Sequence, residues 1–287
     1  MNAKKKLFST DWAAKWAVYR PDKPAIKSWE NRQVLTYAEL NDQGQRLAGY
    51  LVNHRNLKKG DRIAVLAEFS IEYVLLLVAA QKTGLVLVPL NYRLTGPELD
   101  FMLKDSRPKM LLYEEKFSAL IDSTADHDHL VFEGLIDEIL EESQQSAAIN
   151  EAVLLDEDDP IFILYTSGTT GFPKGAIYTH GMLFWNSINT SMSLLLNAES
   201  RTINCMPPFH TGGWNVLLSP LLHHGGYCCL VKKFDAAVLL QLLEEEKPSL
   251  FMAVPTMLKM MTEQPAFSKP IFPVCSTSSL VKPCPFR

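Results

Sequence analysis

Four hydroxyl side chains and two glycines lie within six residues, 166–171, directly after an apolar run. Glycine lets the backbone approach a ligand closely, and consecutive loop amides can form a concave binding surface for an anion. The hydroxyls add donors, and Lys174 adds a mobile positive charge that suits phosphate. A solvated Ser/Thr/Gly linker is the alternative. The pattern predicts a polyphosphate-binding loop made of Thr166, Ser167, Gly168, Thr169, Thr170, Gly171 and Lys174.

The segments on either side of this loop decide which kind of phosphate loop it is. Residues 161–165 are apolar and predict a buried strand, and residues 176–179 have an extended pattern. A P-loop needs the pattern G-x-x-x-x-G-K-[ST] at the start of a helix. Here Gly171 follows Gly168 after only three positions, and Lys174 is followed by Gly175. The spacing of the glycines and the extended segment after the loop therefore both exclude a P-loop NTPase.

The complete string from 165 to 175, Tyr-Thr-Ser-Gly-Thr-Thr-Gly-Phe-Pro-Lys-Gly, resembles the signature loop of the AMP-forming adenylating enzymes. These include acyl-CoA synthetases, luciferase-like enzymes and the adenylation domains of peptide synthetases. The likeness extends from about residue 10 to about residue 265. It implies that the loop holds the β- and γ-phosphates of ATP, with Mg²⁺, coenzyme A and a carboxylic acid, above all a fatty acid, as the other participants.

A second group of chemically suited residues, 207–215, follows another strand-like run. Ligands of open α/β sheets bind beyond the carboxyl ends of the strands, whereas the alternative is a tight turn with one polar histidine. Acyl-CoA synthetases carry a similar Pro-x-Phe-His-x-x-Gly segment beside the acyl pocket. The resemblance implies that His210 acts near the carboxylate or as an aromatic gate, that Gly212 and Gly213 leave room for the acyl chain, and that Trp214 lines it.

The composition of the chain excludes several classes of binding partner. The net charge of −4 provides no basic surface for nucleic acid, and the start of the chain has no secretion signal. No apolar run is long enough to span a membrane, and the five cysteines have no metal-site spacing, so a reducing cytoplasm is expected. An Asp/His cluster at 122–129 is interpreted as a solvated loop rather than a metal site, because nothing nearby completes a coordination shell. We predict no protein metal site.

The periodicity of the chain predicts an α/β fold with a parallel sheet built from βαβ units, as in the large N-terminal domain of adenylate-forming enzymes, but incomplete. Capping boxes at Thr36 and Thr95 predict two helix starts. The expected strands are 25–29, 33–36, 62–66, 85–90, 109–113, 161–165, 203–206 and 249–254. The expected helices are 12–19, 36–51, 70–82, 95–104, 180–195, 235–246 and 256–261, whereas 121–151 is expected to hold only a loop and a surface helix.

The domain organisation expected from the resemblance is a partial N-terminal AMP-binding domain, 1–268, with an internal boundary near 150–160, then a Pro-rich tail, 269–287. The family's Tyr-Gly-x-Thr-Glu string, ribose-binding aspartate and C-terminal domain with its catalytic lysine are absent, so no catalytic residue is assigned. We therefore expect little ligase activity, and self-association through an exposed sheet edge. A non-catalytic ATP-binding or interaction module and an aryl-acid or luciferase-like adenylating enzyme remain alternatives.

Overall fold

A computed structural model describes residues 9–124, 129–149, 153–166 and 173–268. The strands are β1 (Pro24–Ser28), β2 (Val34–Thr36), β3 (Arg62–Leu66), β4 (Val86–Pro89), β5 (Met110–Tyr113), β6 (Phe132–Leu135), β7 (Pro160–Thr166), β8 (Lys174–Thr179), β9 (Arg201–Asn204) and β10 (Tyr227–Leu230). The α-helices are α1 (Trp12–Tyr19), α2 (Tyr37–Asn53), α3 (Ile71–Thr83), α4 (Gly96–Ser106), α5 (Ser118–Ile121), α6 (Ile136–Gln144), α7 (His180–Leu194), α8 (Thr211–Asn215), α9 (Leu218–His224), α10 (Ala236–Glu246) and α11 (Pro255–Thr262), with short 3₁₀ turns at Glu115–Phe117 and Pro265–Ser268.

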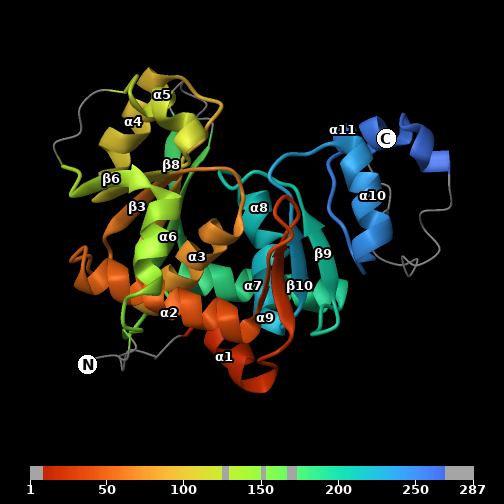
Figure 1. The fold of residues 1–287 in the computed structure, drawn as a ribbon, viewed down its shortest axis with the longest axis horizontal. Helices are drawn as coiled ribbons and strands as arrows, with labels where there is room; N and C mark the ends of the chain where they lie inside the picture. Colours follow the sequence, from red (N-terminus) through yellow and green to blue (C-terminus); the bar gives the residue numbers. More distant parts are fainter. Residues whose placement is uncertain (1–8, 125–128, 150–152, 167–172, 269–287) are drawn as a thin grey trace.

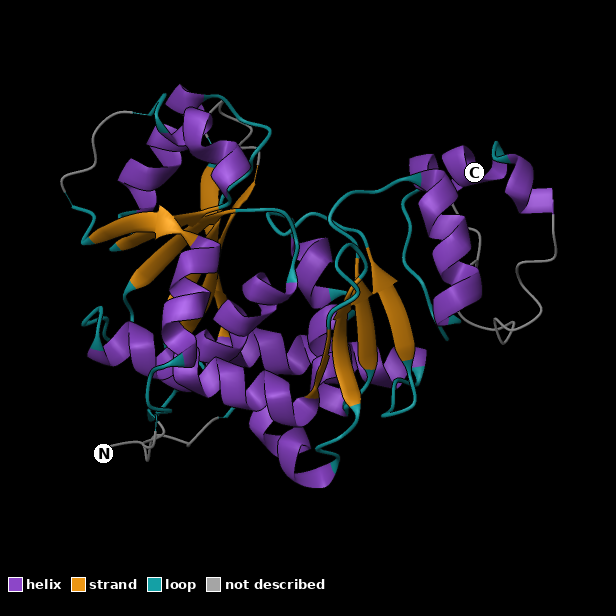
Figure 2. Ribbon diagram, viewed as in Figure 1, coloured by secondary structure: helices purple, strands orange, loops and turns teal. Residues whose placement is uncertain are grey.

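Two sheets share one layer of helices (Figure 1). The first sheet has the order β6-β5-β3-β4-β7-β8, with only β8 antiparallel to its neighbour, and the second has the order β2-β1-β10-β9. The main core lies between them and takes side chains from α2, α3 and both sheets. A second cluster packs α4 on the outer face of the first sheet, and a third packs α10 and α11 on the outer face of the second. Figure 2 shows the resulting alternation of helix and strand layers.

Local sequence signals explain where the helices begin and end. Thr36 caps α2 in a capping box with Glu39, and Thr95 forms the corresponding box with Glu98 at α4. Helix α3 is capped by the Ser70 side chain and ends at Gly84, which has a φ of 71° that suits glycine. These features confirm the predicted helices and the parallel βαβ pattern. None of the helices in the described residues is long and apolar enough to cross a membrane.

Three expectations need correction. Residues 132–135 form strand β6, although this half-buried segment lacks the continuous apolar run of a central strand. Residues 249–254 form no strand, because the amides of Ser249 and Leu250 both bond to the carbonyl of Arg201 and no ladder follows. The strands also form two sheets instead of one. Strand β7, from after residue 159, belongs to the first sheet with β4, and strand β1, from before residue 150, belongs to the second sheet with β10. Both sheets therefore contain strands from either side of 150–160, and the domain boundary there stays a prediction.

A buried ion pair holds α1 against α2 and α3. The Lys82 ammonium, whose side chain is 4% exposed, donates to both carboxylate oxygens of Asp11 at 2.9 and 2.8 Å and to Asn41 Oδ1 at 2.7 Å. Asp11 also accepts the amide of Ala14 and so caps α1. One carboxylate therefore neutralises a buried charge and starts a helix.

We expect Asp11→Ala to lower the free energy of unfolding by about 3 kcal/mol, because it leaves the buried Lys82 charge unpaired and removes a helix cap. Lys82→Met should cost less, since it leaves no buried charge. Urea titration followed by circular dichroism measures both changes. A loss below about 1 kcal/mol for Asp11→Ala would show that this ion pair does not stabilise the fold and that α1 docks by apolar contacts alone.

The ring of His180, at the start of α7, is fully buried, and its Nδ1 lies 2.6 Å from Thr10 Oγ1. Burial lowers the pKa of His180 to about 4, against a smaller raising effect of Asp159. The unfolded chain therefore binds the extra proton between about pH 6.5 and pH 4. The stability that neutral His180 provides is fully present above pH 6.5 and is lost as the pH falls toward 4.

We expect acidification from pH 7 to pH 4.5 to remove about 2 kcal/mol of stability through His180 alone. A His180→Asn variant, which keeps an acceptor near Thr10, should lose less over the same interval. Urea titrations of both proteins at the two pH values give the difference, with the carboxylates and His223 common to both. Equal losses in the two proteins would show that His180 does not titrate in this range.

Candidate functional site

The predicted phosphate loop connects two antiparallel strands. Strands β7 and β8 pair from Phe162 with Tyr178 to Thr166 with Lys174, where the Thr166 hydroxyl lies 3.5 Å from the Lys174 carbonyl oxygen. Both residues are exposed at the open end of this pair. Extended structure after Lys174 confirms the expectation that distinguished this loop from a P-loop. The predicted residues Ser167, Gly168, Thr169, Thr170 and Gly171 lie outside the described residues.

Tyr165 braces the end of this strand pair. It lies opposite Gly175, where a Cβ atom would come within 3.2 Å of the Tyr165 ring and 2.8 Å of an Ile163 methyl group. The Tyr165 hydroxyl donates to Asp105 Oδ2 at 2.6 Å, on α4. Burial, followed by this bond and the Asp105 charge, raises the pKa of Tyr165. Gly175 is thus needed to seat the ring that ties the two strands to α4.

The second predicted group forms a turn between β9 and α8. Asn204, the last residue of β9, accepts the Met206 amide at 3.1 Å and donates to the Gly213 carbonyl at 2.8 Å, so it holds both ends of the turn. His210 is exposed at the cap of α8. A Cβ at Gly213 would lie 2.6 Å from the Pro207 carbonyl oxygen, whereas Gly212 has space beside two methionine methyl groups. Gly213 is therefore required by the turn itself, whereas a Cβ at Gly212 would meet its neighbours at ordinary van der Waals distance.

Trp214 lies in the core. Its ring has no exposed surface, and its Nε1 donates to the Pro208 carbonyl at 2.6 Å. It packs edge-on against Phe69 and Tyr73 and at a tilt against Phe162, which joins the turn to β7 and α3. The acyl-pocket role of His210, Gly212, Gly213 and Trp214 stays a prediction, with Trp214 placed behind the turn and not at its surface.

Two residues that the sequence reasoning missed bring the sheets together at this point. Tyr92 and Arg93 follow β4, and the Tyr92 ring meets the Phe209 ring edge-on at 5.0 Å. The Arg93 guanidinium lies 5.5 Å from the same ring. Partial burial and, secondly, the Arg93 charge lower the pKa of His210, which favours the neutral imidazole. The polar-aromatic triplet Asn-Tyr-Arg at the carboxyl end of a predicted strand was the signal that could have revealed them.

Thr166 and Lys174, the described residues of the first predicted group, lie at the same side of the molecule as the turn that holds the second. Thr166 ends β7, whose neighbour β4 leads to Tyr92, and Tyr92 contacts the turn that follows β9. Carboxyl ends of strands from both sheets converge here, which is where ligands of such sheets bind. Among the described residues, no group of three His, Cys, Asp or Glu residues gathers to hold a metal ion, so no Mg²⁺ ligand is assigned.

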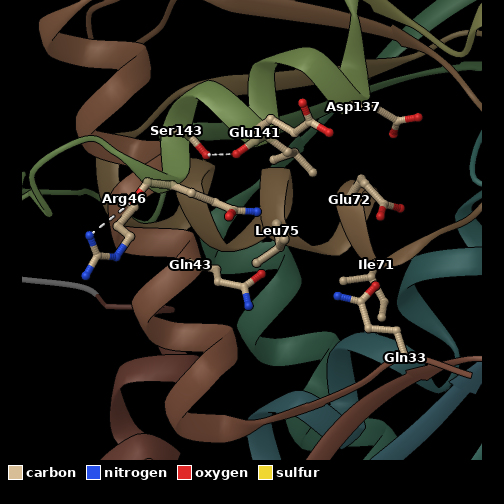
Figure 3. Close-up of a pocket in the computed structure, with 11 residues that line it drawn as sticks. Gln33, Gln43, Arg46, Ile71, Glu72, Leu75, Asp137, Glu141 and Ser143 are labelled. Atoms are coloured by element: carbon tan, nitrogen blue, oxygen red, sulfur yellow. Dashed lines mark hydrogen bonds between the residues drawn. The ribbon is translucent and has the colours of Figure 1, made fainter.

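A cavity of about 260 Å³ opens elsewhere, beside α2, α3 and α6 (Figure 3). Its lining is polar and includes the carboxylates Glu72, Asp137 and Glu141. Burial, followed by the charge of Glu72, raises the pKa of Asp137. None of the predicted phosphate- or acyl-binding residues lines this cavity.

Known proteins with similar sequences include CoA ligases. The chain is 35% identical over 270 residues to an indoleacetate–CoA ligase of Aromatoleum aromaticum, covering 89% of this chain and 51% of the relative. It is 34% identical over 239 residues to the long-chain-fatty-acid–CoA ligase FadD13 of Mycobacterium tuberculosis, covering 82% and 47%. The chain thus spans about half the length of these curated relatives.

Solved structures show the same fold. The inhibitor-bound N-terminal domain of FACL13 from M. tuberculosis superposes with a TM-score of 0.86 and 30% identity, covering 93% of this chain and 67% of that one. ATP-bound MatB from Rhodopseudomonas palustris gives 0.82 and 28%, covering 92% and 53%. The family described as AMP-binding enzyme matches residues 13–280. By its sequence and its fold, the chain belongs to the AMP-binding enzyme family.

Proposed function

We propose that the chain forms the ATP-phosphate and acid-binding part of an acid–CoA ligase. In the proposed reaction, a carboxylate oxygen attacks the α-phosphorus of ATP and pyrophosphate leaves, which gives an acyl adenylate. The sulfur of coenzyme A then attacks the acyl carbon, AMP leaves, and the thiol proton passes to a base or to solvent. The proposal is supported by the signature string 165–175, whose flanking residues Thr166 and Lys174 lie on an antiparallel strand pair at the converging strand ends.

The chain's own residues would act mainly by positioning and by neutralising charge, because a carboxylate is a weak nucleophile toward a negatively charged phosphate. Exposed Thr166 and Lys174 flank the loop and would face the β- and γ-phosphates. His210, exposed on the turn, would face the acid, either as a polar contact or as an aromatic gate. The groups that hold Mg²⁺ and activate coenzyme A are not assigned to any residue here.

The proposal specifies a carboxylic acid as the substrate and does not specify which one. Similar proteins are named for indoleacetate, long-chain fatty acids, ferulate and 2-succinylbenzoate. A fatty acid and an aryl acid are therefore both candidates. A non-catalytic ATP-binding module is the second function to consider, since the chain spans about half of its curated relatives.

We expect the chain to bind ATP and Lys174→Ala to weaken that binding about tenfold or more, because an ammonium–phosphate contact is charge-assisted. Lys58→Ala is the matched control, since it removes an exposed lysine just before β3, at the amino ends of the strands and not at the carboxyl ends where the loop lies. Calorimetric titration with ATP measures all three affinities. If wild-type and Lys174→Ala proteins bind ATP equally, Lys174 does not hold phosphate, and a wild-type chain that does not bind ATP contradicts the proposal.

The exchange of labelled pyrophosphate into ATP, measured with each of the four named acids, distinguishes a ligase from a non-catalytic ATP-binding module. We expect His210→Ala to raise the acid concentration needed for half-maximal exchange about tenfold without changing ATP affinity. His210→Phe should restore it if the ring is a gate, but not if the imidazole contacts the carboxylate. Where exchange is too slow, titration of acid into ATP-saturated protein reports the same change. Equal acid affinities in all three proteins would remove His210 from the site.

A further inference from the structure

The two sheets are joined by an ion pair at the carboxyl ends of their strands. Glu114 follows β5 of the first sheet, and Lys232 follows β10 of the second. The Lys232 ammonium lies 2.8 Å from Glu114 Oε1, while the other oxygen, Oε2, accepts the backbone amide of Glu68 at 2.7 Å. Lys116 Nζ also lies 3.1 Å from this second oxygen. Each carboxylate oxygen of Glu114 therefore has its own partner.

Both members of this pair are held on their own sheets. The Glu114 side chain is 14% exposed, and its amide donates to the Leu66 carbonyl at the end of β3. The backbone amide of Lys232 donates to Glu30 Oε1 at 2.7 Å, beside the turn between β1 and β2. Burial raises the pKa of Glu114. The hydrogen bonds from the Glu68 amide and from Lys232 outweigh this effect of burial and hold the pKa below its ordinary value. The contact is thus a built junction and not a loose surface pair.

A continuous series of contacts connects this junction to His210. Lys116 lies 5.1 Å from the Phe117 ring, which stacks on Tyr92 at 5.3 Å. Tyr92 meets Phe209 at 5.0 Å, and the rings of Phe209 and His210 are 4.7 Å apart. The turn that carries His210 is therefore linked through side chains of the first sheet to Glu114, the residue that meets Lys232.

We propose that Glu114 and Lys232 are positioning residues for adenylation: their ion pair sets the separation between the first sheet, with its phosphate-binding strand pair, and the second sheet, with the His210 turn. This inference rests on the proposed function. The acid and the phosphates would be bound by different sheets, and a displacement of about 1 Å between reacting groups can lower a rate about 100-fold. The ion pair holds the two halves of the site at one spacing.

Lys232→Met, Lys232→Arg and Lys109→Met test the proposal. Lys109 is the matched control, because its ammonium also forms a 2.8 Å ion pair, with Asp61, but at the amino ends of two strands of one sheet. Spin labels at Ile177 on β8 and Val34 on β2, both exposed, report the separation of the sheets after Cys275 and Cys284 are replaced by serine. Cys205, Cys228 and Cys229 are buried and remain.

We expect Lys232→Met to broaden or shift the distance distribution between the labels and to lower acid-dependent exchange at least tenfold, with ATP affinity unchanged within twofold. Lys232→Arg and Lys109→Met should behave like wild type. An unchanged distribution in Lys232→Met overturns the proposal, whatever the exchange rate. A wild-type chain that binds no ATP overturns the proposed function and the catalytic meaning of the pair, while the distance measurement still tests the junction.

Discussion

The convergence of strand ends is the constraint on which the rest of the structure depends. Parallel strands direct all their carboxyl ends to one edge of a sheet. Two such sheets packed on one helix layer can face those edges toward each other, and here they meet through the Tyr92–Phe209 and Glu114–Lys232 contacts. Under the proposed function, this arrangement would let each sheet supply one kind of binding group.

The order of the chain makes this arrangement difficult to foresee. Strand β1 pairs with β10, so that Ile26 lies beside Cys228, about two hundred residues later. Capping boxes and apolar runs are local, and they predicted most helices and strands well. Nothing local states which strands share a sheet. For the same reason β6 was missed, since it exists through its pairing with β5, and 249–254 was predicted as a strand from an apolar run that pairs only at Arg201.

The candidate site, like the fold, has features that local sequence predicts and features that depend on distant segments. A contiguous string carried enough information to predict the extended flank after Lys174, because spacing is visible in sequence, whereas the phosphate-binding role of the loop stays a prediction. The turn at 207–215 was also visible, but not the reason for its shape. Asn204 holds its ends and Trp214 supports it from the core, whereas Tyr92 and Arg93 contact it from a distant segment. Such partners come from tertiary contacts that no spacing rule contains.

The antiparallel course of β8 has a consequence for how phosphate can be held. In a P-loop the glycine-rich turn opens a helix, and the helix N-terminus supplies part of the positive potential. Here the next helix, α7, begins at His180, after the six residues of β8. Six extended residues span about 20 Å, and the field of a helix end falls off within about one turn. Under the proposed function, the N-terminus of α7 would add little to the potential at the phosphates, which makes the charge of Lys174 more important than it would be beside a helix end.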